Sequence, residues 1–284
     1  MMTEESYFNV NGVRLHVVSA GPATGKPVVL LHGFPDHWYG WRHQIGPLAE
    51  RGYRVIVPDQ RGYNLSEKPS GTDSYKIARL AGDVIGILDA LALDRVSLVG
   101  HDWGGAVAWW VAANHVERVE RLAILNCPHF STFQRALLSF EQFKRSWYIY
   151  LFQIPHLAEA LCRLEGYSGL VKLGLAARPG TFSERELASY FEAWGRPDAM
   201  RGMLSWYRAL GREVFSRFPR TQIDCPVLLL WGARDPFLSA SMVEPSMTFC
   251  KDGRSVLFKD ETHWLHWEAP ERVNGLLLEW IEQG

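Results

Sequence analysis

The sequence predicts an α/β protein in which helices cover both faces of a mostly parallel central sheet. Short apolar runs rich in β-branched residues alternate with helical stretches along the chain. These runs are continuously apolar, which is typical of strands that are buried on both faces. Each run leads into a polar or ionisable residue, and in open α/β sheets the functional sites gather at the carboxyl ends of the strands. With 284 residues, the chain is long enough to bury a large core.

The first predicted element is a hairpin, because Asn11-Gly12 lies between alternating apolar residues and favours a two-residue turn. Six buried strands are predicted after it, at 27–32, 54–59, 95–102, 121–126, 226–235 and 255–260. Their last residues are His32, Asp59, Asp102, Asn126, Asp235 and Asp260. An acid at a strand end can simply cap the next helix. The six residues are therefore judged by their spacing and their partners.

The strand pattern stops between Asn126 and Pro226. Residues 129–216 are predicted to form helices, with Ser183 and Asp198 as N-caps. Sixteen of the 36 aromatic residues lie between Phe130 and Phe215. We expect this segment to be a helical cap that packs on itself and also faces an apolar pocket. It would be inserted into a core domain formed by residues 1–128 and 217–284.

Composition argues against several function classes. The net charge is -1 and no Lys/Arg tract could neutralise a run of phosphates, so nucleic acid is not an expected partner. The N-terminus lacks the basic-then-apolar order of a signal peptide, and no apolar run approaches the roughly 18 residues of a membrane span. We expect a cytoplasmic protein with no membrane partner.

Two further motifs predict no site. The four cysteines are far apart and form no CxxC pair, which predicts reduced thiols and no zinc site. The stretch GPATGKP is similar to a phosphate-binding loop, but its glycines are one residue too close and Pro27 follows in place of Ser or Thr.

Gly100-His101-Asp102-Trp103-Gly104 has the glycine frame of the GxSxG nucleophile elbow, with an aspartate in the serine position. The strand before it and the apolar helix after it would place Asp102 at a helix N-terminus, where a carboxylate is electrostatically favoured. On this stretch alone, Asp102 could equally be an N-cap.

Two later residues favour a catalytic role for Asp102. Asp235 follows a strand, and His263 lies 28 residues later, before a helix that starts near Pro270. The order nucleophile, acid, histidine is that of a catalytic triad in which the acid orients the histidine as general base. His266 competes for the role of base, but His263 is nearer the strand exit. No metal site is expected at His263, His266 and Glu268, because no HExxH pattern is present.

The chain resembles the soluble epoxide hydrolases of the α/β-hydrolase fold over nearly its whole length. The matching stretches are LLHGFPDHWYGWRHQ, PDQRGYNLSEKP, LVGHDWGGAVAW, RDPF and THWLHWEAPERVN. The resemblance implies that Asp102 is the nucleophile, Asp235 the charge-relay acid and His263 the base. It also implies that Phe34 and Trp103 supply the backbone N–H groups of an oxyanion hole and contact the substrate.

The resemblance extends to the helical segment, where YIYLFQIP and LSWYRAL are similar to the family's two tyrosine segments. It implies that Tyr148 and Tyr207 give protons to the epoxide oxygen, with Tyr150 and Tyr167 as rivals. One departure is Asn64, which replaces a glycine common in the wider fold. Because Asn tolerates left-handed backbone, we expect the turn to survive.

The aspartate itself narrows the chemistry. A serine attacking an sp3 carbon would form an ether that water cannot cleave, whereas an aspartate forms an ester that water can hydrolyse. The expected function is therefore hydrolysis of a small epoxide to a vicinal diol, with water and without cofactor or metal. A haloalkane dehalogenase is the alternative, although Phe34 stands where that family usually carries Asn or Glu. A non-catalytic binding protein of this fold is the remote alternative, and monomer and homodimer both remain open.

Overall fold

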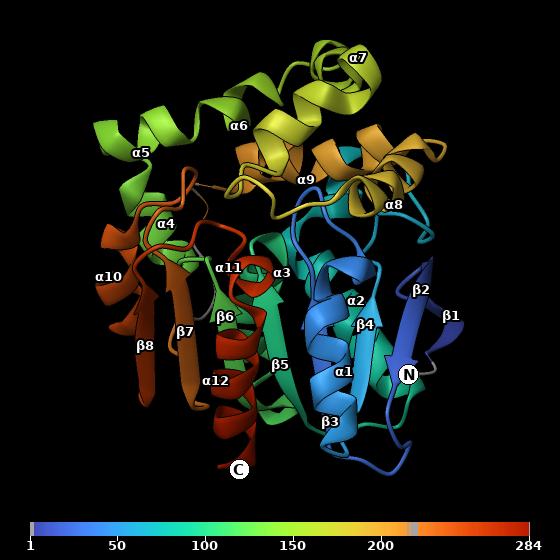
Figure 1. Cartoon of the computed structure of the whole chain (residues 1–284), viewed down its shortest axis with the longest axis vertical. Helices are drawn as coiled ribbons and strands as arrows, with labels where there is room; N and C mark the ends of the chain where they lie inside the picture. Colours follow the sequence, from blue (N-terminus) through green and yellow to red (C-terminus); the bar gives the residue numbers. More distant parts are fainter. Residues whose placement is uncertain (1–2, 215, 217–220, 284) are drawn as a thin grey trace.

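Within the part of the chain that the structure describes, residues 3–214, 216 and 221–283, eight strands form one sheet (Figure 1). The strands of this computed structural model are β1 (Glu4–Val10), β2 (Val13–Ala20), β3 (Pro27–Leu31), β4 (Arg54–Pro58), β5 (Val96–His101), β6 (Val119–Leu125), β7 (Val227–Gly232) and β8 (Gly253–Phe258). Their order across the sheet is β1-β2-β4-β3-β5-β6-β7-β8. The pairs β1–β2 and β2–β4 are antiparallel and the others are parallel. The predicted fold class is confirmed.

Successive side chains of the central strands point to opposite faces and enter two separate cores. In β3, Val29 and Leu31 join the core that α2 (Ile77–Ala90) and α3 (Trp103–Asn114) cover. Val28 and Leu30 join the other core, under α1 (Arg42–Glu50) and α12 (Pro270–Glu282). This arrangement explains why the strands read as continuous apolar runs.

Several local predictions can be compared with the structure. The Asn11-Gly12 turn is present, with φ of 47° and 75°. Asn64 keeps its turn with φ of 37°. Four strands are shorter than predicted: β3 and β4 each end one residue early, β5 ends before Asp102, and β7 ends at Gly232. Asp235 therefore lies in a loop after β7, where its N–H donates to the Gly232 carbonyl oxygen.

The chain between β6 and β7 is helical and lies above the sheet in Figure 1. It contains α4 (Phe130–Ala136), α5 (Phe140–Arg145), α6 (Trp147–Leu151), α7 (Leu157–Gly174), α8 (Glu184–Gly195) and α9 (Ala199–Glu213). Ser183 caps α8 with a full capping box, as predicted. Asp198 occupies the N-cap position of α9 but makes no side-chain capping bond, because its backbone is left-handed with φ of 60°. The predicted domain boundary at 216/217 adjoins residues 217–220, which lie outside the described residues.

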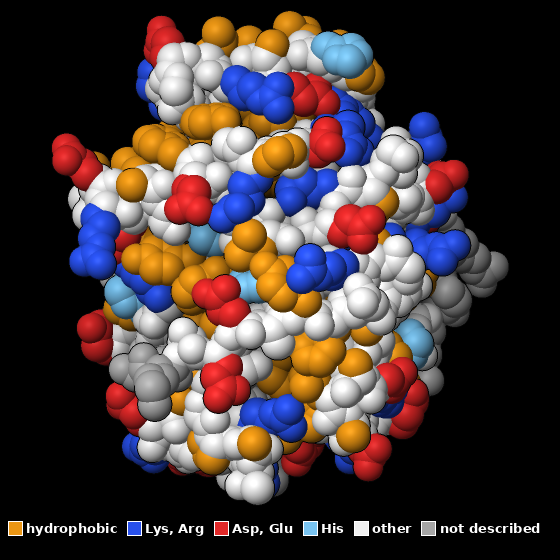
Figure 2. Space-filling view, turned by 90° about the vertical axis from the view of Figure 1, so that its right-hand side faces the viewer, with side chains coloured by type: hydrophobic (Ala, Val, Ile, Leu, Met, Phe, Trp, Pro, Cys, Tyr) orange, Lys and Arg blue, Asp and Glu red, His pale blue; other side chains and the backbone are white. Residues whose placement is uncertain are grey.

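The remaining short helices are α10 (Val243–Met247) and α11 (Leu265–Glu268). No helix of the described chain is both long and apolar enough to cross a membrane. Figure 2 shows acidic and basic side chains interspersed on the face it draws, which agrees with the balanced charge of the sequence. All four cysteines are free thiols.

Candidate active site

Asp102 lies on a strained turn between β5 and α3. Its backbone has φ of 50° and ψ of -122°, a conformation that L-residues rarely adopt. The glycines around it are required by close packing: a Cβ on Gly104 would lie 2.1 Å from the Leu31 carbonyl oxygen, and one on Gly100 would lie 2.4 Å from the Gly104 oxygen. The glycine frame of the sequence motif therefore lets α3 start directly against β3 and β5, with the Asp102 side chain at its N-terminus.

His263 lies between two carboxylates. Its Nδ1 is 2.7 Å from Oδ2 of Asp235, and its Nε2 is 3.6 Å from Oδ2 of Asp102. Burial alone would lower the pKa of His263, but the charges of Asp235 and Asp102 outweigh burial and raise this pKa to about 10. Burial likewise opposes the charge on Asp102, and the neighbouring His263 outweighs it and holds the Asp102 pKa below its usual value. With Asp102 unmodified, the pair is an imidazolium and a carboxylate at neutral pH.

Asp235 is held by several donors. Its Oδ1 accepts the N–H groups of Phe237 at 2.7 Å and Leu238 at 3.0 Å, and its Oδ2 accepts the amide of Asn126 at 2.6 Å. Asn126 has φ of 43° and also accepts the N–H of Gly232 through its own Oδ1. Sequence reasoning missed this supporting role, although Asn126 was one of the six polar strand ends. Asn126 thus joins the ends of β6 and β7 and fixes the carboxylate that orients His263.

The loop after β3 supplies a hydrogen-bond donor to Asp102. The N–H of Phe34 donates to Oδ1 of Asp102 at 2.8 Å, and the Phe34-Pro35 peptide bond is cis. Gly33 is needed here, since a Cβ would lie 2.4 Å from Cβ of Asp102. The N–H of Trp103 is the first of α3 and so has no acceptor within the helix. Both residues of the predicted oxyanion hole therefore border the Asp102 carboxylate.

The same loop is fastened to α8. The Tyr190 hydroxyl donates to Oδ1 of Asp36 at 2.9 Å, and the Trp194 indole N–H donates to the carbonyl oxygen of Pro35 at 2.7 Å. All four of these residues are buried. The helical segment therefore holds the loop that borders Asp102.

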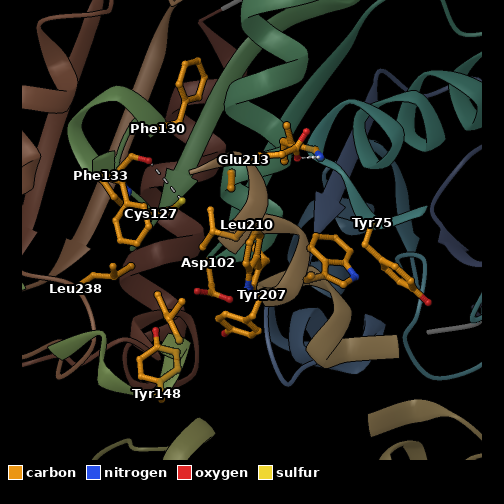
Figure 3. Close-up of a pocket in the computed structure, with 16 residues that line it drawn as sticks. Tyr75, Asp102, Cys127, Phe130, Phe133, Tyr148, Tyr207, Leu210, Glu213 and Leu238 are labelled. Atoms are coloured by element: carbon orange, nitrogen blue, oxygen red, sulfur yellow. Dashed lines mark hydrogen bonds between the residues drawn. The ribbon is translucent and has the colours of Figure 1, made fainter. Parts of the chain in front are cut away.

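A cavity of about 110 Å³, measured as the space open to the centre of a water molecule, lies over Asp102. Tyr148 of α6 and Tyr207 of α9 line it together with Asp102, and Figure 3 shows both rings beside the carboxylate. Their ring centroids are 5.8 Å apart. Burial first, and then nearby charge, raises the pKa of each phenol well above 10. Both tyrosines are therefore protonated donors at neutral pH.

The rival tyrosines lie elsewhere. Tyr150 is 48% exposed, and the Tyr167 ring packs against Phe191 and Trp194. Neither lines the cavity over Asp102. The helical segment therefore brings Tyr148 and Tyr207, and neither rival, to the carboxylate.

Not all six polar strand ends reach the site. His32 supports the neighbouring loop, since its Nδ1 donates to the Gly33 oxygen and its Nε2 accepts the N–H of Gln60. Asp59 is 2.7 Å from the ring of His16, and Asp260 pairs with Arg234 on the surface. Of the six, Asp102 and Asp235 contact His263, and Asn126 is connected to it through Asp235.

His266, the other candidate base, lies in a separate buried cluster with Asp36 and His101. The ligand atoms of these three side chains lie within 4.8 Å of one another. Burial raises the pKa of Asp36 to about 7 and lowers that of His101 to about 3. The His101 ring centroid lies 4.6 Å from that of His263, with the rings tilted, and none of the three cluster residues lines the cavity over Asp102.

Comparison with known proteins agrees with this geometry. Residues 26–270 match the family model of the alpha/beta hydrolase fold. The chain is 42% identical to the AB hydrolase superfamily protein YfhM of Bacillus subtilis, over 97% of each chain. It is 35% identical to Epoxide hydrolase 4 of Mus musculus, over 96% of this chain and 77% of that protein.

Among solved structures, a Bacillus megaterium epoxide hydrolase in complex with an inhibitor superimposes with a TM-score of 0.90 at 31% identity. The superposition covers 98% of this chain and all of the other. The sequence relatives and the solved structure thus indicate the same family over nearly the whole chain. The chain belongs to the epoxide hydrolase family of the α/β-hydrolase fold, whose members are hydrolase enzymes.

Proposed function

We propose that this protein converts epoxides to vicinal diols through an ester formed on Asp102. The observation that carries the proposal is the arrangement of one carboxylate opposite two protonated phenols across a single apolar cavity, with His263 and Asp235 behind the carboxylate. A carboxylate can open the ring, and the phenols can protonate the oxygen that leaves. The helical segment 129–216 is the cap domain that supplies these phenols.

In the first step, Oδ2 of Asp102 attacks a ring carbon, because Oδ1 is held by the Phe34 N–H. The carbon–oxygen bond of the ring breaks, and the oxygen takes a proton from Tyr148 or Tyr207. Such general-acid help is typically worth about 10²- to 10⁴-fold in rate. Ester formation removes the negative charge of Asp102, so the pKa of His263 falls and its proton restores the tyrosine.

In the second step, the now neutral His263 takes a proton from water, and the hydroxide adds to the carbonyl carbon of the ester. The N–H groups of Phe34 and Trp103 hold the negative oxygen that forms. The ester carbon–oxygen bond then breaks, and the departing alkoxide takes the proton of the carboxylic acid. The products are the diol, the Asp102 carboxylate and protonated His263, as at the start.

The pair of phenols favours epoxides over haloalkanes. An epoxide oxygen leaves as an alkoxide and needs a proton, whereas a halide leaves without one and needs only weak donors. A haloalkane dehalogenase would therefore lose little activity when Tyr148 and Tyr207 are both replaced by Phe.

The decisive experiment is a single turnover of styrene oxide with excess enzyme in ¹⁸O-labelled water. The mechanism requires the label in the Asp102 carboxylate and an unlabelled first diol. Label in the first diol would mean direct attack by water and would refute the ester route. In a matched experiment, His263→Gln should accumulate the ester, detectable as a mass increase on the peptide that contains Asp102.

A further inference from the structure

The active-site cavity extends beyond the reacting groups into an apolar compartment. Figure 3 shows Asp102 between Tyr148 on one side and Glu213 on the other. The walls between Asp102 and Glu213 are mostly apolar and come from α3, α4 and α9 (Ala106, Phe130, Phe133 and Leu210). A substrate attacked by Asp102 must place the rest of its molecule in this compartment.

Most polar side chains on these walls already form hydrogen bonds within the protein. The Tyr75 hydroxyl donates to the Pro69 oxygen at 2.9 Å, and the Trp206 indole donates to the Arg61 oxygen at 2.9 Å. Glu213 differs from them. Its Oε2 accepts the N–H of Ile77 at 3.2 Å, and its Oε1 has no hydrogen-bond partner among the residues that the structure describes. One carboxylate oxygen is thus available to a ligand at the far end of the compartment.

The charge of the cavity is negative at both ends. Asp102 and Glu213 line it, and no Lys, Arg or His of the described chain does. The one cation at the reacting end, His263, lies between Asp102 and Asp235. At the far end, Ile77 is the first residue of α2, and its N–H donates to Oε2 of Glu213.

Cations near Glu213 are occupied by another acid. Lys76 precedes Ile77, and Arg212 precedes Glu213. Both form ion pairs with Asp73, at 3.1 Å and 3.3 Å. Neither lines the cavity. Among the described residues, the charge that a bound tail meets at this end is therefore that of Glu213.

We propose that Glu213 selects the substrate class: the enzyme takes apolar epoxides whose far end is cationic or neutral and discriminates against those that end in a carboxylate. This inference rests on the proposed epoxide hydrolysis and adds the chemistry of the substrate tail. A cation finds an unpaired carboxylate oxygen in an apolar compartment. An anion finds a like charge and, within residues 3–214, 216 and 221–283, no compensating cation on the walls.

The test uses aryl glycidyl ethers that differ only in the para substituent. The substituent is a chain of one to four methylenes that ends in trimethylammonium, in tert-butyl as its neutral isostere, or in carboxylate. For the length that reaches Glu213, we expect kcat/KM to be about 10-fold higher for the cation than for the anion, with the neutral ether between them. The ratio should fall as salt is raised, because ions screen a partly exposed charge.

Glu213→Gln keeps an acceptor for the Ile77 N–H and removes the charge, so the cation-to-anion ratio should fall to about 1 to 2. Glu117→Gln is the matched control, since this exposed glutamate lies past the opposite end of α3 from Asp102 and should leave the ratio unchanged. A wild-type ratio near 1 at every chain length, or a ratio that Glu213→Gln leaves intact, would overturn the inference.

The salt dependence of the wild-type ratio tests the charge even if the variant does not fold. A ratio that stays constant with salt would count against Glu213. Failure of the wild-type enzyme to hydrolyse even the tert-butyl ether would overturn the proposed function itself, and this inference with it.

Discussion

The strongest quantitative prediction concerns His263 in the variant Asp102→Asn. The pKa of His263 is raised to about 10 because two carboxylates surround the ring. One of them, Asp102, lies 3.6 Å from Nε2. Unit charges at this distance attract by about 4.6 kcal/mol at an effective dielectric constant of about 20, which corresponds to a pKa change of about 3.4. Removing the charge of Asp102 should therefore bring the pKa of His263 down to roughly 7.

The assay is an NMR titration of ¹⁵N-histidine-labelled protein from pH 5 to pH 11, with His263→Gln to assign the signal. Wild-type His263 should stay protonated through neutral pH, and Asp102→Asn should titrate near neutrality. The variant mimics the uncharged ester of the proposed mechanism, in which the same drop would make His263 a base only after the ring has opened. A wild-type pKa below 7, or an equal pKa in both proteins, would refute this reasoning.

Three further predictions follow from the site and its surroundings. Tyr148→Phe and Tyr207→Phe should each lower kcat/KM for an epoxide by about 10²-fold, while Tyr150→Phe, on an exposed ring, should not; equal activity of all three would exclude phenols as proton donors. Asn126→Ala removes a hydrogen bond to the charged Asp235 and should lower kcat by about 10- to 100-fold with little change in KM; an unchanged kcat would contradict its orienting role. Asp36 has a folded pKa of about 7, above that of the unfolded chain, so ionising it opposes folding and stability is lost as the pH rises from about 4 through 7. Asp36→Asn should therefore gain stability relative to wild type between pH 4 and pH 8, by up to about 4 kcal/mol in urea unfolding, and an equal difference at both pH values would contradict the burial argument.

The parts of the site that the sequence could predict are those encoded locally. The elbow around Asp102 needs small residues beside a strand end, and the order of Asp102, Asp235 and His263 follows from the order of the strands. The helix start at Ser183 is also local, since its capping box spans only four residues.

The unpredicted features arise where distant segments meet. The bond between Asn126 and Asp235 joins residues 109 positions apart and depends on the left-handed backbone of Asn126. Asp36, His101 and His266 come from the loop after β3, the end of β5 and α11, so no spacing in the sequence marks them as neighbours. Glu213 reaches the cavity only because α9 ends beside the start of α2. Such contacts depend on packing between elements, which hydrophobic periodicity does not encode.

The attachment of α8 to the loop at Pro35 and Asp36 limits how this enzyme can be recombined with its relatives. The hydrogen bonds from Tyr190 and Trp194 cross from the helical segment to the loop whose Phe34 N–H donates to Asp102. A chimaera that exchanges residues 129–216 alone keeps those bonds only if the incoming helix carries the same two donors at the same places. Exchanges intended to alter substrate range should therefore transfer residues 33–36 together with the helices. These two separate stretches of the chain form one structural unit.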